Sequence, residues 1–128
     1  MFSVGIDMVE IKRIKKSCSN PRFLNKILGN QEYEQLKERN FPLQSIAANF
    51  CAKEAFSKAL GTGIRNFSLC DVEILRNELG EPYIILNGKA KDIAKINNLE
   101  FRVSITHTKE YACAVVIYKR SEFHEYKQ

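Results

Sequence analysis

Several features that would place these 128 residues in a large structural class are absent. No run of about 18 apolar residues occurs, which excludes a membrane-spanning helix and predicts no membrane partner. The first residues lack the basic and long apolar regions of a secretory signal, so we expect a cytoplasmic protein. Hydrophobic residues nevertheless make up 45% of the chain and charged residues 27%. This composition excludes intrinsic disorder and predicts one globular domain over residues 1–128.

Closely spaced cysteines are also lacking. The four cysteines lie far apart, and no C-x-x-C pair is present to begin a zinc site or a redox motif. We therefore expect free, buried or half-buried thiols in a reducing compartment and no disulfide framework. They are Cys18, Cys51, Cys70 and Cys113.

Acidic residues are missing from one segment. The formal net charge is +5, yet residues 12–26 alone contain six basic residues and no Asp or Glu, so the rest of the chain is nearly neutral. Such a basic segment is either a solvated helix face or a docking surface for an acidic partner. Only one aromatic residue, Phe23, lies among these charges, which disfavours a surface on which nucleic-acid bases stack. We expect no nucleic-acid partner.

Hydrophobic periodicity and turn residues predict an α+β fold in which helices come first and hairpins later. In the strand expected over residues 2–11, Val4, Ile6 and Met8 alternate with small or polar residues, and Asp7 projects from the opposite face. Helices are expected at 20–29 with Asn20 as cap and Pro21 as first residue, at 30–37 with Asn30 as cap, at 42–60 ending at Gly61, and at 89–96. Hairpins are expected around 72–86 and over 101–118.

Glu54 is the most informative residue of the longest expected helix. It lies four residues after Phe50 on or beside the apolar stripe, where an unpaired carboxylate is costly and needs a cation. Lys58, one turn later, is one candidate, and a metal ion is the other. Asp7 adds a second carboxylate in an otherwise apolar strand, and Mg²⁺ takes one or two protein carboxylates together with water and substrate phosphate.

Two further segments carry weaker signals. Gly61-Thr62-Gly63 would allow backbone to approach a phosphate beside Lys58, although Gly61 equally suits a helix C-cap. His107 ends an alternating strand at its rim. A Ser-His-Asp hydrolase is not supported, because Ser104 lies on the other face of that strand.

Taken together, these segments resemble the holo-acyl-carrier-protein synthase family, the short 4′-phosphopantetheinyl transferases. The similarity covers nearly the whole chain in the family's order, and its most specific part is the K-E-A-x-x-K-A-L-G-T-G block that begins at Lys53. The other matching stretches are Val4–Ile11 with Arg13-Ile14, Arg22-Phe23-Leu24, Gly80-Glu81-Pro82, and Val103–Thr108 through Val115–Ile117.

The resemblance implies a trimer with active sites between subunits. It implies Mg²⁺-dependent transfer of 4′-phosphopantetheine from coenzyme A to a serine of apo-acyl carrier protein, as in fatty-acid biosynthesis, with release of adenosine 3′,5′-bisphosphate. Asp7 and Glu54 fall on its magnesium positions, Lys58 on its catalytic lysine, and Arg13, Arg22 and Phe23 on the matched segment expected to dock the carrier. Matches to the segments that line the coenzyme A site are Lys58, Gly61, Thr62, Gly63, Ser104, His107 and Thr108.

Physical reasoning agrees with this reaction. Magnesium and Lys58 would neutralise charge on the phosphates, and Glu54 is the nearest candidate base for the serine proton. The chain departs from the family at Asn49, where arginine is frequent, and at Thr106, where serine is usual. Two other readings are a small basic nucleic-acid-binding protein and a trimeric scaffold without catalysis. The confined charge argues against the first, and the presence of Asp7, Glu54 and Lys58 argues against the second.

Overall fold

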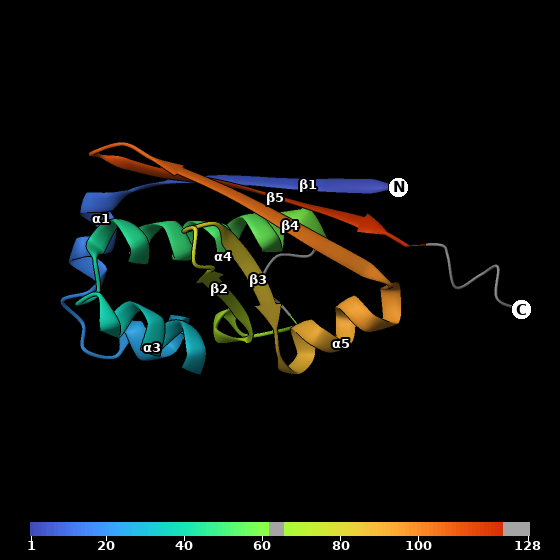
Figure 1. Ribbon diagram of the computed structural model, residues 1–128, viewed down its shortest axis with the longest axis horizontal. Coiled ribbons are helices and arrows are strands. Elements are labelled where there is room, and N and C mark those ends of the chain that lie inside the picture. The colour runs from blue at the N-terminus through green and yellow to red at the C-terminus, as the bar shows by residue number, and fades with distance from the viewer. Residues whose placement is uncertain (62–65, 122–128) are drawn as a thin grey trace, which may run out of the picture.

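The computed structural model describes residues 1–61 and 66–121, which form an α+β fold (Figure 1). The elements in chain order are β1 (Phe2–Glu10), α1 (Ile11–Ser17), α2 (Phe23–Ile27), α3 (Asn30–Glu38), α4 (Leu43–Leu60), the short 3₁₀ helix η1 (Leu69–Asp71), β2 (Val72–Arg76), β3 (Pro82–Leu86), α5 (Gly88–Asn97), β4 (Leu99–His107) and β5 (Tyr111–Arg120). The expected long helix, both hairpins and the α5 helix are confirmed.

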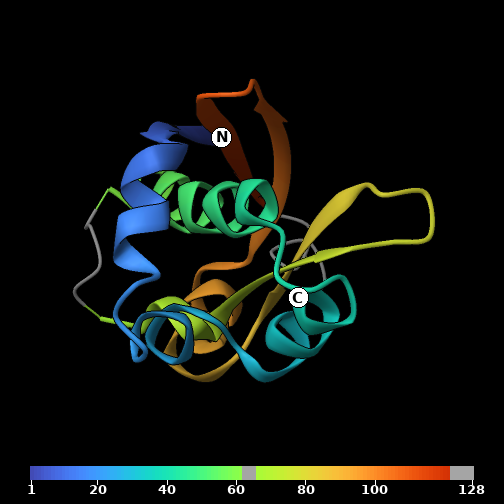
Figure 2. The same ribbon diagram turned by 90° about the vertical axis from the view of Figure 1, so that its left-hand side faces the viewer.

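The two ends of the described chain meet in one antiparallel sheet with the strand order β1-β5-β4. Phe2 pairs with Lys119 and Glu10 with Tyr111, so β1 is bonded to β5 along its whole length. Strands β2 and β3 form a separate two-stranded hairpin. Helix α4 lies beneath the three-stranded sheet, and Figure 2, which turns the molecule, shows the yellow β2–β3 hairpin projecting beyond the other elements (Figures 1 and 2).

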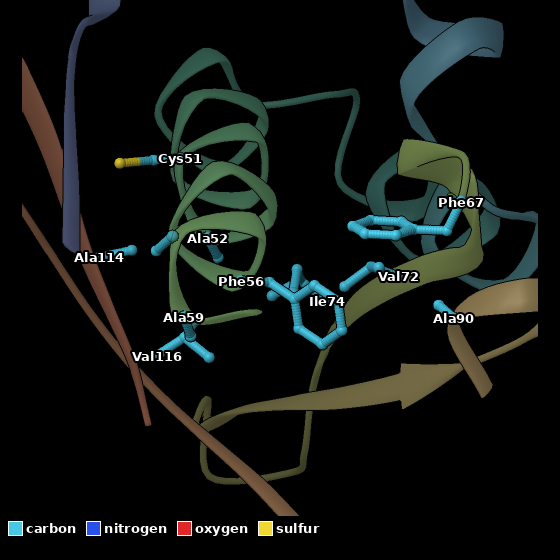
Figure 3. Close-up of a cluster of buried hydrophobic side chains, with 11 residues drawn as sticks. Cys51, Ala52, Phe56, Ala59, Phe67, Val72, Ile74, Ala90, Ala114 and Val116 are labelled. Carbon is cyan, nitrogen blue, oxygen red and sulfur yellow. The ribbon is translucent and has the colours of Figure 1, made fainter. Parts of the chain in front are cut away.

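Helix α4 forms the centre of the core and carries small residues where it meets the sheet. Cys51, Ala55 and Ala59 on this helix are at most 2% exposed and belong to the same cluster as Ala114 and Val116 of β5. Phe56, from the same helix, packs edge-on against Phe67 (Figure 3). Small side chains allow the sheet backbone to approach the helix closely, which fixes the position of β1 over α4.

A buried ion pair ties α4 to the helical layer below it. Lys53 Nζ donates to Glu32 Oε1 at 2.7 Å, and neither side chain is exposed. The same ammonium donates to the carbonyl oxygens of Leu69 and Val72, so its three hydrogens all have acceptors. Burial raises the pKa of Glu32 and lowers that of Lys53, although each partner's charge opposes the shift. The pair is therefore structural, and it anchors the residue immediately before Glu54.

The segment after the first strand differs from expectation. Strand β1 ends at Glu10, and residues 11–17 form helix α1, in which Ile11 and Ile14 are buried one turn apart. No helix was expected here, because two apolar residues among basic ones are a weak amphipathic signal. Helix α2 begins at Phe23 rather than at Pro21, since Asn20 Oδ1 accepts from the Arg22 amide and closes a turn before the helix.

Two other boundaries shift by a residue or two. Gly29, not Asn30, is the residue that precedes α3, and Glu32 turns back to accept the Gly29 amide at 3.1 Å. Helix α4 ends as expected, because Gly61 adopts φ +78° and its amide reaches the carbonyl oxygens of Ser57 and Lys58.

The outer face of the sheet is apolar and exposed. Val4, Ile6 and Met8 of β1 are each at least 60% exposed, and Phe2 extends the row. Ile117, which pairs with Val4, continues the same face onto β5. The inner residues of β1, among them Gly5 and Asp7, instead face α4. We call the row Phe2, Val4, Ile6, Met8 and Ile117 the outer apolar face.

Two expectations drawn from composition can be compared with the structure. Within the described ranges, no helix is long and apolar enough to cross a membrane. All four cysteines are free, with Cys51 buried and the other three half-buried, as expected.

Candidate active site

Asp7 is brought to α4 by the close approach of β1. A Cβ atom on Gly5 would overlap backbone atoms of Ala55 and Ala59, so glycine is required for the strand to lie this close. The Ser3 hydroxyl donates to the Ala59 carbonyl oxygen at 2.7 Å and ties the same strand face to the helix. The carboxylate of Asp7, two residues after Gly5, is consequently held against the exposed edge of α4.

Lys58 forms an ion pair with Asp7. Its Nζ donates to Asp7 Oδ1 at 3.0 Å; the lysine side chain is 57% exposed and the aspartate 16%. This hydrogen bond and the Asp7 charge raise the pKa of Lys58, which keeps the ammonium protonated. The sequence placed Glu54 beside Lys58 as the simple helix pair, but the salt bridge that forms joins Lys58 to the strand.

Glu54 is half-buried and has no salt bridge within the hydrogen-bonding range of a described cation. Burial raises the pKa of Glu54, the nearby Asp7 charge raises it further, and Lys58 opposes the shift. Two carboxylates and one ammonium therefore share this place, and their formal charge is −1. The sequence analysis expected these three residues to come together, and the structure brings them together.

The donor set fits a hard divalent cation that keeps open coordination positions. Within residues 1–61 and 66–121, no group of three or more His, Cys, Asp and Glu side chains is arranged to hold a metal. Asp7 and Glu54 offer two carboxylates whose mutual repulsion a cation would relieve. Magnesium is bound in proteins through one or two carboxylates and completes its octahedron with water and phosphate oxygens. The pair is consistent with such a site.

Cys51 and Gly5 take part in positioning Asp7, and the sequence gave little sign of it. The Cys51 thiol lies 3.1 Å from the Asp7 carbonyl oxygen and 3.6 Å from Asp7 Oδ2. Burial, followed by the Asp7 charge, raises the pKa of Cys51 to about 12, so the group remains a neutral thiol. A glycine one turn of strand before an acid was the available signal for a close helix contact.

The remaining expected coenzyme A residues lie in separate places. Gly61 follows Lys58 by one helical turn and is exposed, whereas Thr62 and Gly63 lie outside the described residues. His107 and Thr108 lie at the β4–β5 turn, where the Thr108 hydroxyl accepts from the amides of Glu110 and Tyr111. Ser104 points to the outer side of the sheet, opposite to Asp7. A single subunit does not gather all of them around Asp7.

The expected docking residues lie on and after α1. The six basic side chains of residues 12–26 are all exposed, including Arg13 and Arg22. Phe23 is half-buried, with its ring 6.1 Å from that of Phe50 on α4. The segment is therefore a charged surface backed by an apolar contact to the helix that carries Glu54.

Comparison with known proteins agrees with this arrangement. The model of the 4′-phosphopantetheinyl transferase superfamily matches residues 3–116. The holo-[acyl-carrier-protein] synthase of Fusobacterium nucleatum is 42% identical over 119 residues, which cover 91% of this chain and 98% of the relative. The crystal structure of the Neisseria meningitidis holo-[acyl-carrier-protein] synthase superposes with a TM-score of 0.86 at 27% identity, covering 92% of this chain and 98% of that one. A Helicobacter pylori holo-[acyl-carrier-protein] synthase, solved in complex with coenzyme A, is 35% identical with a TM-score of 0.77 and covers 91% and 99%.

The fold and the Asp7–Glu54–Lys58 group thus define an enzyme of the phosphopantetheinyl transferase class. Within that superfamily, the chain belongs to the holo-acyl-carrier-protein synthase family.

Proposed function

We propose that this enzyme transfers 4′-phosphopantetheine from coenzyme A to a serine of apo-acyl carrier protein and releases adenosine 3′,5′-bisphosphate. The observation that carries the proposal is the meeting of Asp7, Glu54 and Lys58 at the α4–β1 contact. Family membership and the coenzyme A complex of the Helicobacter pylori relative support the choice of donor.

Asp7 and Glu54 would hold Mg²⁺, which supplies neutralisation of pyrophosphate charge when it is bound. Lys58 is suited to binding an oxygen of the transferred phosphoryl group, because its side chain is exposed and its charge is secured by Asp7. An ammonium in that position stabilises charge that develops on the phosphate oxygens as the bond to the leaving nucleotide breaks.

Glu54 is our candidate for accepting the serine proton. The serine oxygen forms the new bond to phosphorus, the phosphorus–oxygen bond to adenosine 3′,5′-bisphosphate breaks, and the serine O–H proton moves to a carboxylate oxygen. The raised pKa of Glu54 brings its basicity closer to what proton transfer near neutral pH requires.

The carrier protein docks on the basic segment in this proposal. Its exposed side chains surround the start of the helical layer, and acyl carrier proteins are small and acidic, so the charges are complementary. Phe23 joins this surface to Phe50 on α4, close in sequence to Glu54.

We further propose that three subunits assemble through the outer apolar face. Side chains such as Phe2 (73% exposed) and Met8 (63%) form a contiguous apolar row that a soluble monomer rarely leaves uncovered. Assembly would also explain why Ser104 points away from Asp7 of its own subunit, since it could then face a neighbouring one.

Substitution of the carboxylates tests the reaction. Asp7→Asn and Glu54→Gln should each lower kcat/KM for carrier modification by at least about 100-fold while the circular dichroism spectrum stays native. Glu34→Gln, an exposed carboxylate on α3, is the matched control and should leave activity unchanged. Full Mg²⁺-dependent activity in both site variants would refute the assignment.

A further inference from the structure

A second charged site lies on the other side of α4 from β1. A cavity of about 310 Å³ opens between α3, the first half of α4 and the β2–β3 turn. Its polar lining is formed by Gln35, Arg39, Asn49, Arg76, Asn77 and Glu78. Neither Asp7, Glu54 nor Lys58 lines it.

Arg76 is held rigidly at the wall of this cavity. The Gln35 side chain bonds both backbone groups of Arg76, accepting its amide at 2.8 Å and donating to its carbonyl oxygen at 2.9 Å. Arg76 Nη2 donates to Asn49 Oδ1 at 2.9 Å. Asn49 is itself 1% exposed and is fixed by donating to Glu32 Oε2 and to the Ile74 carbonyl oxygen. The guanidinium is thus oriented before any ligand arrives.

The positive charge at this cavity is not neutralised by a salt bridge. Among the described residues, neither Arg76 nor Arg39 has a carboxylate within ion-pair distance. The buried carboxylate of Glu32 is already paired with Lys53. Burial lowers the pKa of Arg76, and the neighbouring Arg39 lowers it further. Glu78 contributes one negative charge to the lining, so two cations outnumber one anion.

The position of this guanidinium is informative because of Asn49. The family often has an arginine there on the helix, and this chain has an amide instead. The structure places a guanidinium on that amide from another element, strand β2. The positive charge is retained beside position 49, although the sequence position that supplies it has changed.

We propose that the cavity binds a phosphomonoester dianion, with Arg76 and Arg39 as its ligands. A guanidinium presents paired N–H groups that match two phosphate oxygens, and only one hydrogen bond of the Arg76 side chain is used within the protein. This inference rests on the proposed function, in which the phosphomonoester is the 3′-phosphate of coenzyme A.

The location of the cavity determines which subunit it serves. Asn49 and Glu54 are five residues apart on α4, which turns their side chains about 140° away from each other around the helix axis. One coenzyme A molecule therefore contacts both places only when α4 helices of two subunits contribute. The phosphomonoester cavity of one subunit would complete the Asp7–Glu54 site of its neighbour.

The test compares coenzyme A with 3′-dephospho-coenzyme A as donors for carrier modification. Arg76→Gln should raise the KM for coenzyme A about tenfold and leave the KM for the dephospho donor unchanged. Arg39→Gln, an exposed position that does not endanger folding, should shift the same ratio in the same direction. Lys37→Gln, an exposed cation on α3 outside the cavity lining, is the control and should change neither value.

Binding of inorganic phosphate, followed by calorimetry on the trimer, distinguishes the source of the ligand. Phosphate binding that is lost in Arg76→Gln, with an unchanged donor ratio, would support the cavity as a site for free phosphate. Equal effects of both arginine variants on both donors, together with no arginine-dependent phosphate binding, would overturn the proposal. Transfer from the dephospho donor shows separately whether the proposed function holds, because failure of the wild type with both donors would refute that function instead.

Discussion

Gly5 of β1 and Ala55 of α4 are in such close backbone contact that a Cβ atom on the glycine would overlap the alanine carbonyl oxygen. This contact joins the strand that carries Asp7 to the helix that carries Glu54 and Lys58. The geometry of the candidate site therefore depends on a residue that has no side chain.

Gly5→Ala should disturb both stability and activity. The methyl group must push β1 away from α4, and overpacking of this kind costs about 3 kcal/mol or more where backbone blocks it. Chemical denaturation measures the free energy of unfolding. Ser3→Ala on the same strand face, which loses one hydrogen bond, should cost only about 1 kcal/mol. If the two variants were equally stable, the close contact would not matter.

Loss of the buried ammonium should be among the most destabilising changes. Lys53→Met leaves the Glu32 carboxylate buried without its partner, which costs about 3–5 kcal/mol. Lys53→Met combined with Glu32→Leu should recover a large part of that cost, because no charge remains buried. Thermal unfolding of the three proteins gives the comparison, and a single variant as stable as the wild type would contradict the structural role of the pair.

Glu54→Gln should stabilise the fold while it removes activity. Burial and Asp7 raise the pKa of Glu54 in the folded protein, so the native state binds this proton more tightly than the unfolded chain does. Ionisation of Glu54 consequently destabilises the fold as the pH rises through that pKa. The variant should match the wild type near pH 4 and become the more stable protein towards pH 7. A stability difference that shrinks as pH rises would show that the sign is wrong.

The outer apolar face gives a prediction about assembly. Ile6→Lys places a charge in the middle of this face and should shift the protein from trimer to monomer in light scattering after size exclusion. Activity should fall with assembly if the sites lie between subunits. Ile96→Lys on α5, which alters a side chain that is 79% exposed, should leave the mass unchanged. An Ile6→Lys trimer with full activity would place the interface elsewhere.

Charge reversal on α1 tests the docking surface. Arg13→Glu should raise the KM for the carrier about tenfold at low salt, with the KM for coenzyme A unchanged, because the substituted group is exposed and contacts only the partner. The difference should narrow as ionic strength rises. Lys91→Glu on α5 makes the same charge change away from this surface. An unaltered carrier KM in Arg13→Glu would return the basic segment to a solvated face.

Local patterns predicted the elements better than their pairing. The spacing from Leu43 to Leu60 and the glycine that follows were sufficient for α4, and alternation was sufficient for the β4–β5 hairpin. The pairing of β1 with β5 joins residues more than 100 positions apart, and no local signal specifies it. Helix α1 was missed because its two buried isoleucines are outnumbered by lysine and arginine.

The candidate site was predictable only in part for a similar reason. Asp7, Glu54 and Lys58 stand out as charged residues in apolar surroundings, so the sequence could name them. The Asn49–Arg76 contact joins α4 to the end of β2, and an arginine before a turn carries no sign of such a partner. Contacts between side chains from distant elements depend on tertiary packing, which residue periodicity does not encode.

The central claim is the transfer reaction, and mass spectrometry of the carrier tests it most directly. Apo-acyl carrier protein incubated with the enzyme, coenzyme A and Mg²⁺ should gain about 340 Da, the mass of one phosphopantetheine group attached to a serine. Asp7→Asn enzyme should leave the carrier mass unchanged over the same time. A carrier that stays at its original mass with folded wild-type enzyme, or a gain that is the same with the Asp7→Asn variant, would contradict the account.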